Sequence, residues 1–350
     1  MIWVTWRQFR TTILAAVGGI LTLAAIALIC GTIVRQRTGQ RSAVTADYVD
    51  ESTFEWLVAA SLVSIGVLAA LLPVALGVLV GVTVFSRDIE RGTHVLGLSQ
   101  SVSRARWYGS RLLVVFVPVS IAMAVLGAAL EWTRTADALW HYGYLSRATW
   151  SGHSSLTFPL FQSGALTAAT YTALALVLGS LAALLLRNTL GSMVVTLVAV
   201  SAFMLGFQFG ARPHYASPVV EARPLDAQYR VAYTSDQGSV WQLSEGYVDA
   251  QGRRVEFDYR KCNQIGENLE WSQRPDETLA DYEAREATMI ATQDREFEAC
   301  QRAQGLDHYE VRYHPDSLFR RFQVTEASLA LGLSLLLIIP SMWAVRRLRP

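Results

Sequence analysis

Two long apolar runs without a charged residue constrain this chain more than any other feature. They cover Trp56–Val84 and Leu112–Leu130 and contain no Asp, Glu, Lys or Arg. A helix of about 20 apolar residues is long enough to cross the hydrocarbon core of a membrane. The stretch between them, Phe85–Arg111, which we call the charged segment, contains five arginines and two acids. We therefore expect the charged segment to lie in water at one membrane face.

Four further apolar runs complete a set of six predicted spans. The whole chain is 52% hydrophobic and 17% charged, whereas soluble domains have about 25% charged residues. The predicted class is an all-α polytopic membrane protein with six transmembrane helices. Pro73 predicts a kink in the second span, and the spacing of Gly77 and Gly81 predicts a close helix contact. The other runs are Thr11–Val34, Phe158–Leu186, Leu190–Gly210 and Val324–Val345.

The sizeable soluble stretch, residues 211–323, lies between the fifth and sixth spans. Strand-like stretches at Tyr229–Thr234 and Val255–Tyr259 and a charged helical stretch at Thr278–Ala303 predict a small α+β domain. Cys262 and Cys300 both belong to it. They form a disulfide if the domain faces an oxidising compartment, and are otherwise two unpaired thiols.

The distribution of arginines predicts the orientation. Cytoplasmic loops of membrane proteins carry an excess of Lys and Arg, and arginines gather near the N-terminus, in the charged segment, in the short turn at Arg187 and in the tail after the sixth span. We therefore expect a multi-pass protein of the cell membrane. Both termini and the charged segment would be cytoplasmic, and residues 211–323 extracellular. A net charge of +1, spread over loops, argues against a nucleic-acid partner.

Residues 1–10 and the charged segment have amphipathic patterns. Trp3 and Trp6 lie beside Arg7 and Arg10, which is typical of a short helix in the membrane interface, or of the flank of the first span, residues 11–34. In the charged segment, Phe85–Gly97 has helical character, and Arg104–Arg111 forms a second amphipathic piece that re-enters the membrane.

Several classes of function lack their usual residues in this sequence. No ionisable residue lies near the middle of a span, Glu131 and Glu326 being at outer ends. This argues against a proton- or ion-coupled carrier. Lys261, in the soluble domain, is the single lysine, so the chain has no P-loop and ATP hydrolysis must come from a partner. We expect no enzyme activity or cofactor in this chain. Five of the six histidines lie in the loop before the fourth span or in the soluble domain, and their spacing matches no metal site (His141, His153, His214, His308 and His314).

Several motifs in and around the charged segment resemble one family of transporters. They are Glu90-Arg91-Gly92-Thr93, Leu98-Ser99-Gln100-Ser101-Val102-Ser103-Arg104 and Arg106-Trp107. The start WVTWRQFR, the six spans, the soluble domain before the last span and the stretch YHPDSLFRRFQVTE (Tyr313–Glu326) are similar too. In these respects the chain resembles the permease subunits of type-2 ATP-binding cassette (ABC) exporters, in particular those common in actinobacteria.

The resemblance implies an ATP-driven exporter of an amphiphilic or apolar substrate, such as a drug, antibiotic, lipid or peptide. ATP and Mg²⁺ would bind to a separate ATPase subunit, and the permease would form a dimer with a second copy or a homologue in the lipid bilayer. Residues 1–10 would be an elbow helix, containing Trp3, Trp6, Arg7 and Arg10. Contact with the ATPase would fall to Arg87, Asp88, Glu90, Arg91, Gly92, Thr93, Gln100 and Arg104.

The residues alone leave two other classes of protein open, a membrane-anchored sensor or receptor and a polytopic membrane enzyme. A membrane-anchored sensor or receptor could bind a ligand in its extracellular domain and signal through the charged segment. Such a protein would need no ATPase.

Overall fold

The computed structural model of the chain describes residues 2–41, 53–92, 103–134, 154–225, 234–235, 238–265 and 271–347. The chain divides into a helical unit, residues 1–216 and 316–350, and a smaller unit, residues 217–315. Within these described ranges, six helices are long and apolar enough to cross a membrane, which confirms the six predicted spans.

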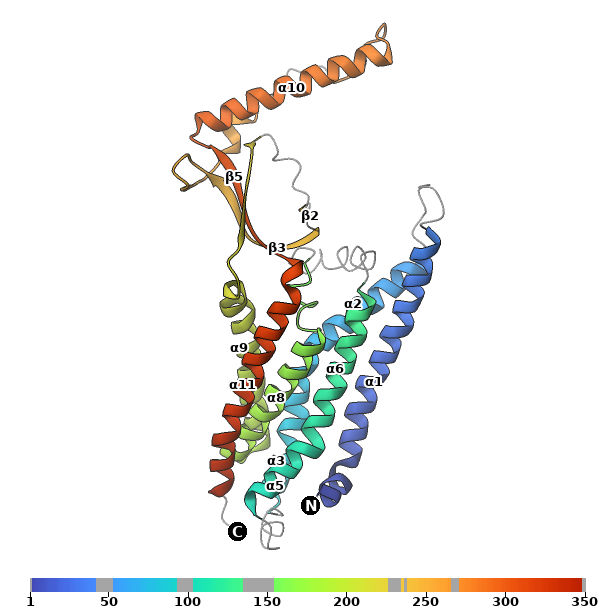
Figure 1. Cartoon of the computed structure of the whole chain (residues 1–350), viewed down its shortest axis with the longest axis vertical. Helices are drawn as coiled ribbons and strands as arrows, with labels where there is room; N and C mark the ends of the chain where they lie inside the picture. The colour runs from blue at the N-terminus through green and yellow to red at the C-terminus, as the bar shows by residue number, and fades with distance from the viewer. Residues whose placement is uncertain are drawn as a thin grey trace. The chain divides into compact units, whose positions relative to one another are not determined.

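The helical unit is a bundle around one central helix (Figure 1). The central helix is α8 (Ala165–Leu186), which packs against α6, α9, α11 and the second span. The N-terminal helix, α1, packs against α6 and α2 on the other side of the bundle. Both termini lie at the same end of this unit as the short helices of the charged segment. The remaining long helices are α1 (Ile2–Arg41), α2 (Thr53–Leu76), α6 (Val117–Thr133), α9 (Thr189–Leu205) and α11 (Phe319–Arg346).

The second span changes its helical geometry shortly after Pro73. The helix α2 passes into a π-helical segment, η1 (Gly77–Gly81), and then into α3 (Thr83–Glu90). A Cβ atom on Gly77 would lie 2.8 Å from the Cβ of Ala175, and one on Gly81 would lie 2.9 Å from the carbonyl oxygen of Leu176. The two glycines therefore let η1 approach α8 closely, as their spacing predicts.

The boundaries of three predicted elements differ from those in the structure. Residues 2–10 are not a separate elbow helix, because no glycine or proline interrupts α1 there and it runs on as one helix. The fourth span begins at Ala165 rather than Phe158, after turns at 154–164 that include Pro159, which has no N–H to donate. The fifth span continues beyond α9 through η4 (Gly206–Ala211) and η5 (Arg212–His214).

The smaller unit contains a five-stranded antiparallel sheet and one long helix. The strand order is β1-β5-β3-β2, with β4 also paired to β3. The helix α10 (Leu279–Ala303) begins at its cap Thr278, as the sequence predicts. The predicted strand Val255–Tyr259 is wrong except at Val255, and Tyr229–Thr234 lies outside the described residues except for Thr234. The strands are β1 (Val219–Arg223), β2 (Thr234–Ser235), β3 (Gly238–Val248), β4 (Arg254–Val255) and β5 (His308–Pro315).

The smaller unit is shorter than the predicted domain of residues 211–323. Its bounds are Ser217 and Pro315, because residues at both ends of the predicted domain pack in the helical unit. At the second end, the short helix η8 (Asp316–Leu318) leads directly into α11. The sixth span thus begins before the predicted Val324.

Candidate functional site

The charged segment is not wholly in water, because its most buried arginine lies inside the bundle. Arg111, on α5 (Arg104–Arg111), is 4% exposed. Its guanidinium forms an ion pair with Asp88 of α3 and donates to the carbonyl oxygen of Val84 at 2.5 Å. It also stacks 4.1 Å from the ring of Trp107. The expectation that the charged segment lies in water is wrong for Arg111, which belongs to the stretch predicted to re-enter the membrane: Asp88 neutralises it and aromatic rings cover it.

The first turns of α1 contact this ion pair through residues outside the four predicted elbow residues. Gln8 donates to both carboxylate oxygens of Asp88 at 3.3 Å. The ring of Phe9 lies 5.3 Å from the Arg111 guanidinium. The hydroxyls of Thr5 and Ser110 are 3.3 Å apart. Polar contacts therefore join the first turns of α1 to both α3 and α5.

The four predicted elbow residues lie on the exposed surface of α1. Trp3 and Trp6 are exposed, and the Arg7 guanidinium lies 5.4 Å from the Trp3 ring. Arg10 is exposed as well. Aromatic and cationic side chains on one exposed helical face suit the membrane interface.

Glu90 connects α3 to the turn between α8 and α9. Its carboxylate accepts a hydrogen bond of 2.6 Å from the backbone N–H of Thr189, the first residue of α9. The backbone N–H of Gly191, two residues further along, donates to the side chain of the N-cap residue Asn188 at 2.8 Å. A carboxylate at a helix N-terminus satisfies an unpaired N–H and interacts favourably with the helix dipole.

The other predicted contact residues are exposed, half-buried or outside the described residues. Arg87, Arg91 and Gly92 are exposed at the end of α3, and Gly92 has a φ of +68°, a conformation that favours glycine. Arg104 is half-buried and donates to the carbonyl oxygen of Arg346 at 2.5 Å. Thr93 and Gln100 lie outside the described residues.

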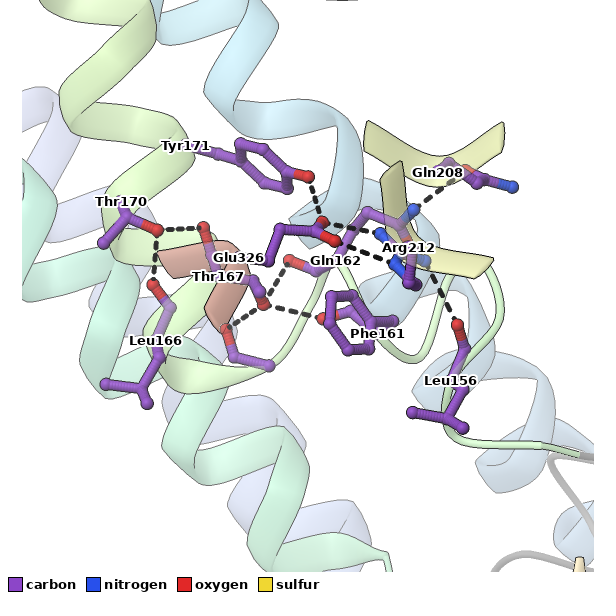
Figure 2. Close-up of polar contacts among 11 residues, drawn as sticks. Leu156, Phe161, Gln162, Leu166, Thr167, Thr170, Tyr171, Gln208, Arg212 and Glu326 are labelled. Carbon is purple, nitrogen blue, oxygen red and sulfur yellow. Dashed lines mark hydrogen bonds and ion pairs between the residues drawn. The ribbon is translucent and has the colours of Figure 1, made fainter. Parts of the chain in front are cut away.

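A second ionic site lies near the opposite end of the helical unit. Arg212, in η5, and Glu326, in α11, are both fully buried. Two guanidinium nitrogens of Arg212 donate to the two oxygens of Glu326 at 2.7 and 3.0 Å. The hydroxyl of Tyr171, on α8, also donates to Glu326. Figure 2 shows the carboxylate between Tyr171 and Arg212. We call these three residues the buried ionic cluster.

The same arginine holds the irregular segment 154–164. Arg212 donates to the carbonyl oxygen of Leu156 at 3.1 Å, and its guanidinium lies 3.8 Å from the ring of Phe161 (Figure 2). The Thr167 hydroxyl donates to the carbonyl oxygen of Phe161 at 2.7 Å. Backbone groups without helical partners are tolerated at membrane depth only when the protein itself satisfies them. Arg212 and Thr167 supply such partners.

Glu131 fixes the start of α8 beside this cluster. Its carboxylate accepts from the backbone N–H of Ala165 and from the side chain of Gln323, both at 2.9 Å. The sequence placed Glu131 and Glu326 at the outer ends of spans, and Arg212 fell in the predicted soluble stretch, residues 211–323. A Pro follows Arg212 directly, which is typical of a loop, so only the burial in the structure identifies the pair.

In the smaller unit, a disulfide joins Cys262 and Cys300. The bond ties η7 (Tyr259–Cys262) to the last turn of α10. Each described histidine has its own neighbour: His214 contacts Gly210, His308 contacts Asp307, and His314 is buried beside Trp241. His141 and His153 lie outside the described residues.

Comparison with protein families identifies the chain. A family described as "ABC-2 membrane transporter related" matches residues 12–212, which run from α1 to Arg212. The chain belongs to this family. It is thus a permease of the ABC transporter type, a multi-pass membrane component that works with an ABC ATPase. No curated protein and no solved structure matches the permease.

Proposed function

We propose that the permease exports an amphiphilic or apolar substrate from the cell, powered by ATP hydrolysis on a separate subunit that docks on the exposed end of α3. The observation that carries this proposal is the pair of contacts made by Asp88 and Glu90. These carboxylates, two residues apart on α3, hold two different neighbours, Arg111 of α5 and Thr189 of α9.

These contacts would let one movement reach most of the bundle. A push on Arg87 or Arg91 acts directly on α3, because both residues project from its end. The Asp88–Arg111 pair then acts on α5 and, through Gln8, on α1. Glu90 acts on the α8–α9 turn. Short polar links between helix ends transmit displacement without repacking of the apolar core.

The sidedness of the proposal follows from charge. Exposed arginines at this end of the bundle include Arg7, Arg10, Arg187 and Arg346, and the positive-inside rule assigns such an end to the cytoplasm. The smaller unit would then be extracellular, where its disulfide is stable. A dimer with a second copy or a homologue completes the proposal, with ATP and Mg²⁺ on the ATPase.

Co-purification of an ATPase tests the docking surface. Gly92→Trp adds a large side chain at an exposed position with positive φ, and Arg91→Glu reverses an exposed charge. We expect either change to remove the ATPase from the purified permease. Arg295→Glu, an exposed charge reversal on α10 in the smaller unit, is the matched control and should leave the complex intact.

Two results would contradict the proposal. If Gly92→Trp and Arg91→Glu leave ATPase association and ATP turnover at the control level, the exposed end of α3 is not the docking surface. If no ATPase accompanies the unmodified permease, a sensor or receptor explains the chain better. The substrate class is tested with an NBD-labelled phospholipid and a rhodamine dye, whose ATP-dependent movement into inside-out vesicles would support export.

A further inference from the structure

The buried ionic cluster requires an explanation beyond packing. Ionisable side chains inside candidate spans are costly and are usually retained for function. A well-packed apolar trio would fill the same volume, often with equal or greater stability. Arg212, Glu326 and Tyr171 nevertheless occupy the junction of η5, α11 and α8, and the described contacts of Arg212 extend to the segment 154–164.

The central helix α8 connects this cluster to the charged segment. Its C-terminal half contacts α5 through the hydroxyls of Ser180 and Tyr108, which are 3.0 Å apart. Next to Ser180, a Cβ on Gly179 would lie 2.4 Å from the carbonyl oxygen of Gly77, so α8 and η1 touch backbone to backbone. Nine residues toward its N-terminus, about 13 Å along the axis, α8 carries Tyr171.

Because α8 is tightly packed against η1 and α5 at its C-terminal end, we expect it to move as one rigid body. A displacement of α3 and α5 would therefore shift Tyr171 along the helix axis. A hydroxyl-to-carboxylate hydrogen bond weakens steeply with distance and angle. Tyr171 would leave Glu326 before the two-bonded Arg212–Glu326 pair separates, since that pair has the stronger geometry.

We propose that the buried ionic cluster is a latch that keeps this end of the permease closed, and that α8 releases it through Tyr171 when the ATPase drives the charged segment. Tyr171 is a positioning residue in this scheme: it holds Glu326, Glu326 orients Arg212, and Arg212 holds the segment 154–164. Release loosens that segment at the end of the bundle opposite the charged segment. The inference rests on the proposed function, because it needs an ATP-driven movement.

Hydrogen–deuterium exchange of the permease–ATPase complex in lipid nanodiscs tests the latch without any substitution. Several amides of the segment 154–164 are hydrogen-bonded, including those of Phe161, Ser163 and Gly164. We expect these amides to exchange slowly without nucleotide. With Mg-ATP and orthovanadate, they should exchange about tenfold faster or more, the change expected for loss of one hydrogen bond to a charged group.

Two matched variants isolate the role of Tyr171. Tyr171→Phe removes only the hydroxyl that donates to Glu326. Without nucleotide, this variant should exchange the amides of residues 154–164 about tenfold faster than the unmodified complex. Adding nucleotide should then increase the exchange rate of this variant only slightly. Thr170→Val also removes one hydroxyl from α8, but that hydroxyl bonds only to Leu166 and Thr167 of the same helix among the contacts described (Figure 2). In Thr170→Val, the amides of residues 154–164 should exchange at the same rate as in the unmodified complex, with and without nucleotide.

The outcomes separate this inference from the proposed function. If residues 103–111 and 187–192 respond to nucleotide but residues 154–164 do not, the latch is wrong and ATP-driven coupling stands. If Tyr171→Phe exchanges like Thr170→Val, Tyr171 is not the release element. If no part of the permease responds and no ATPase is bound, both proposals fail. The nucleotide comparison on the unmodified complex remains decisive even if Tyr171→Phe fails to fold.

Discussion

Removing one member of the Arg212–Glu326 pair should destabilise the permease strongly. Arg212→Met deletes two hydrogen bonds to Glu326 and one to Leu156 and leaves a fully buried carboxylate with Tyr171 as its other described donor. Breaking a buried ion pair in this way costs about 3–5 kcal/mol, which is at least about a 100-fold change in the unfolding equilibrium. Glu326→Leu instead leaves the buried guanidinium of Arg212 without its carboxylate and should lower the free energy of unfolding by a similar amount.

The double variant decides whether charge pairing is the cause. Arg212→Met combined with Glu326→Leu removes both charges but leaves the Tyr171 hydroxyl and the Leu156 carbonyl without these partners, so its stability should recover most of the single costs and stay about 1–3 kcal/mol below the original. Unfolding in mixed detergent micelles by added dodecyl sulfate, followed by circular dichroism, gives the four free energies of the cycle. The reasoning is refuted if Arg212→Met costs less than about 1 kcal/mol, or if the two single costs simply add in the double variant.

Three further predictions concern other contacts. Gly179→Ala should cost about 1–3 kcal/mol, because the new methyl group would lie 2.4 Å from a backbone oxygen of η1. Gly332→Ala, where nothing lies within 4 Å, should be close to neutral in the same unfolding assay. Replacement of both disulfide cysteines by serine should lower the stability of the smaller unit by about 4 kcal/mol, given a sequence separation of 38, measured as faster proteolysis of residues 217–315. Arg285 lowers the pKa of Glu277 from 4.5 to about 2, chiefly by a side-chain hydrogen bond, so this contact stabilises the start of α10 above pH 4.5 and is lost as the pH falls toward 2. The melting temperature of the smaller unit, measured in the full chain, should therefore be higher in the unmodified protein than in Glu277→Gln at neutral pH, and the two should become equal as the pH falls toward 2. A difference between the two proteins that does not change with pH would contradict this.

The spans and the helical pieces were predictable because they depend on local patterns. Apolar runs of sufficient length predicted six spans, and amphipathic or charged helical patterns predicted α5 and the helix that begins after Thr278. The GxxxG spacing predicted the approach of η1 to α8. Each of these signals lies within a few tens of residues and needs no knowledge of distant partners.

The two ionic sites were not predictable in the same way, because their partners are far apart in the sequence. Asp88 and Arg111 appeared to be solvated charges of one loop, since nothing local shows that Phe9 and Trp107 cover Arg111. Arg212 and Glu326 are separated by the whole smaller unit. A polar residue next to a proline at the end of a span usually lies in a loop, and tertiary packing overrides that tendency here.

The two sites share an arrangement that suits a protein moved from outside the membrane. Each contains one arginine and one carboxylate in contact, Arg111 with Asp88 and Arg212 with Glu326. A shift that keeps the partners together carries no net charge through the hydrocarbon, so the membrane potential does no work on it. Under the proposed function the work is mechanical, and the tight contact between α8 and η1 lies between the two sites. Each ion pair makes its charges tolerable inside the bundle. In the proposed function, a displacement of α3 acts first on the Asp88–Arg111 pair at one end and then, through α8, on the Arg212–Glu326 pair at the other end.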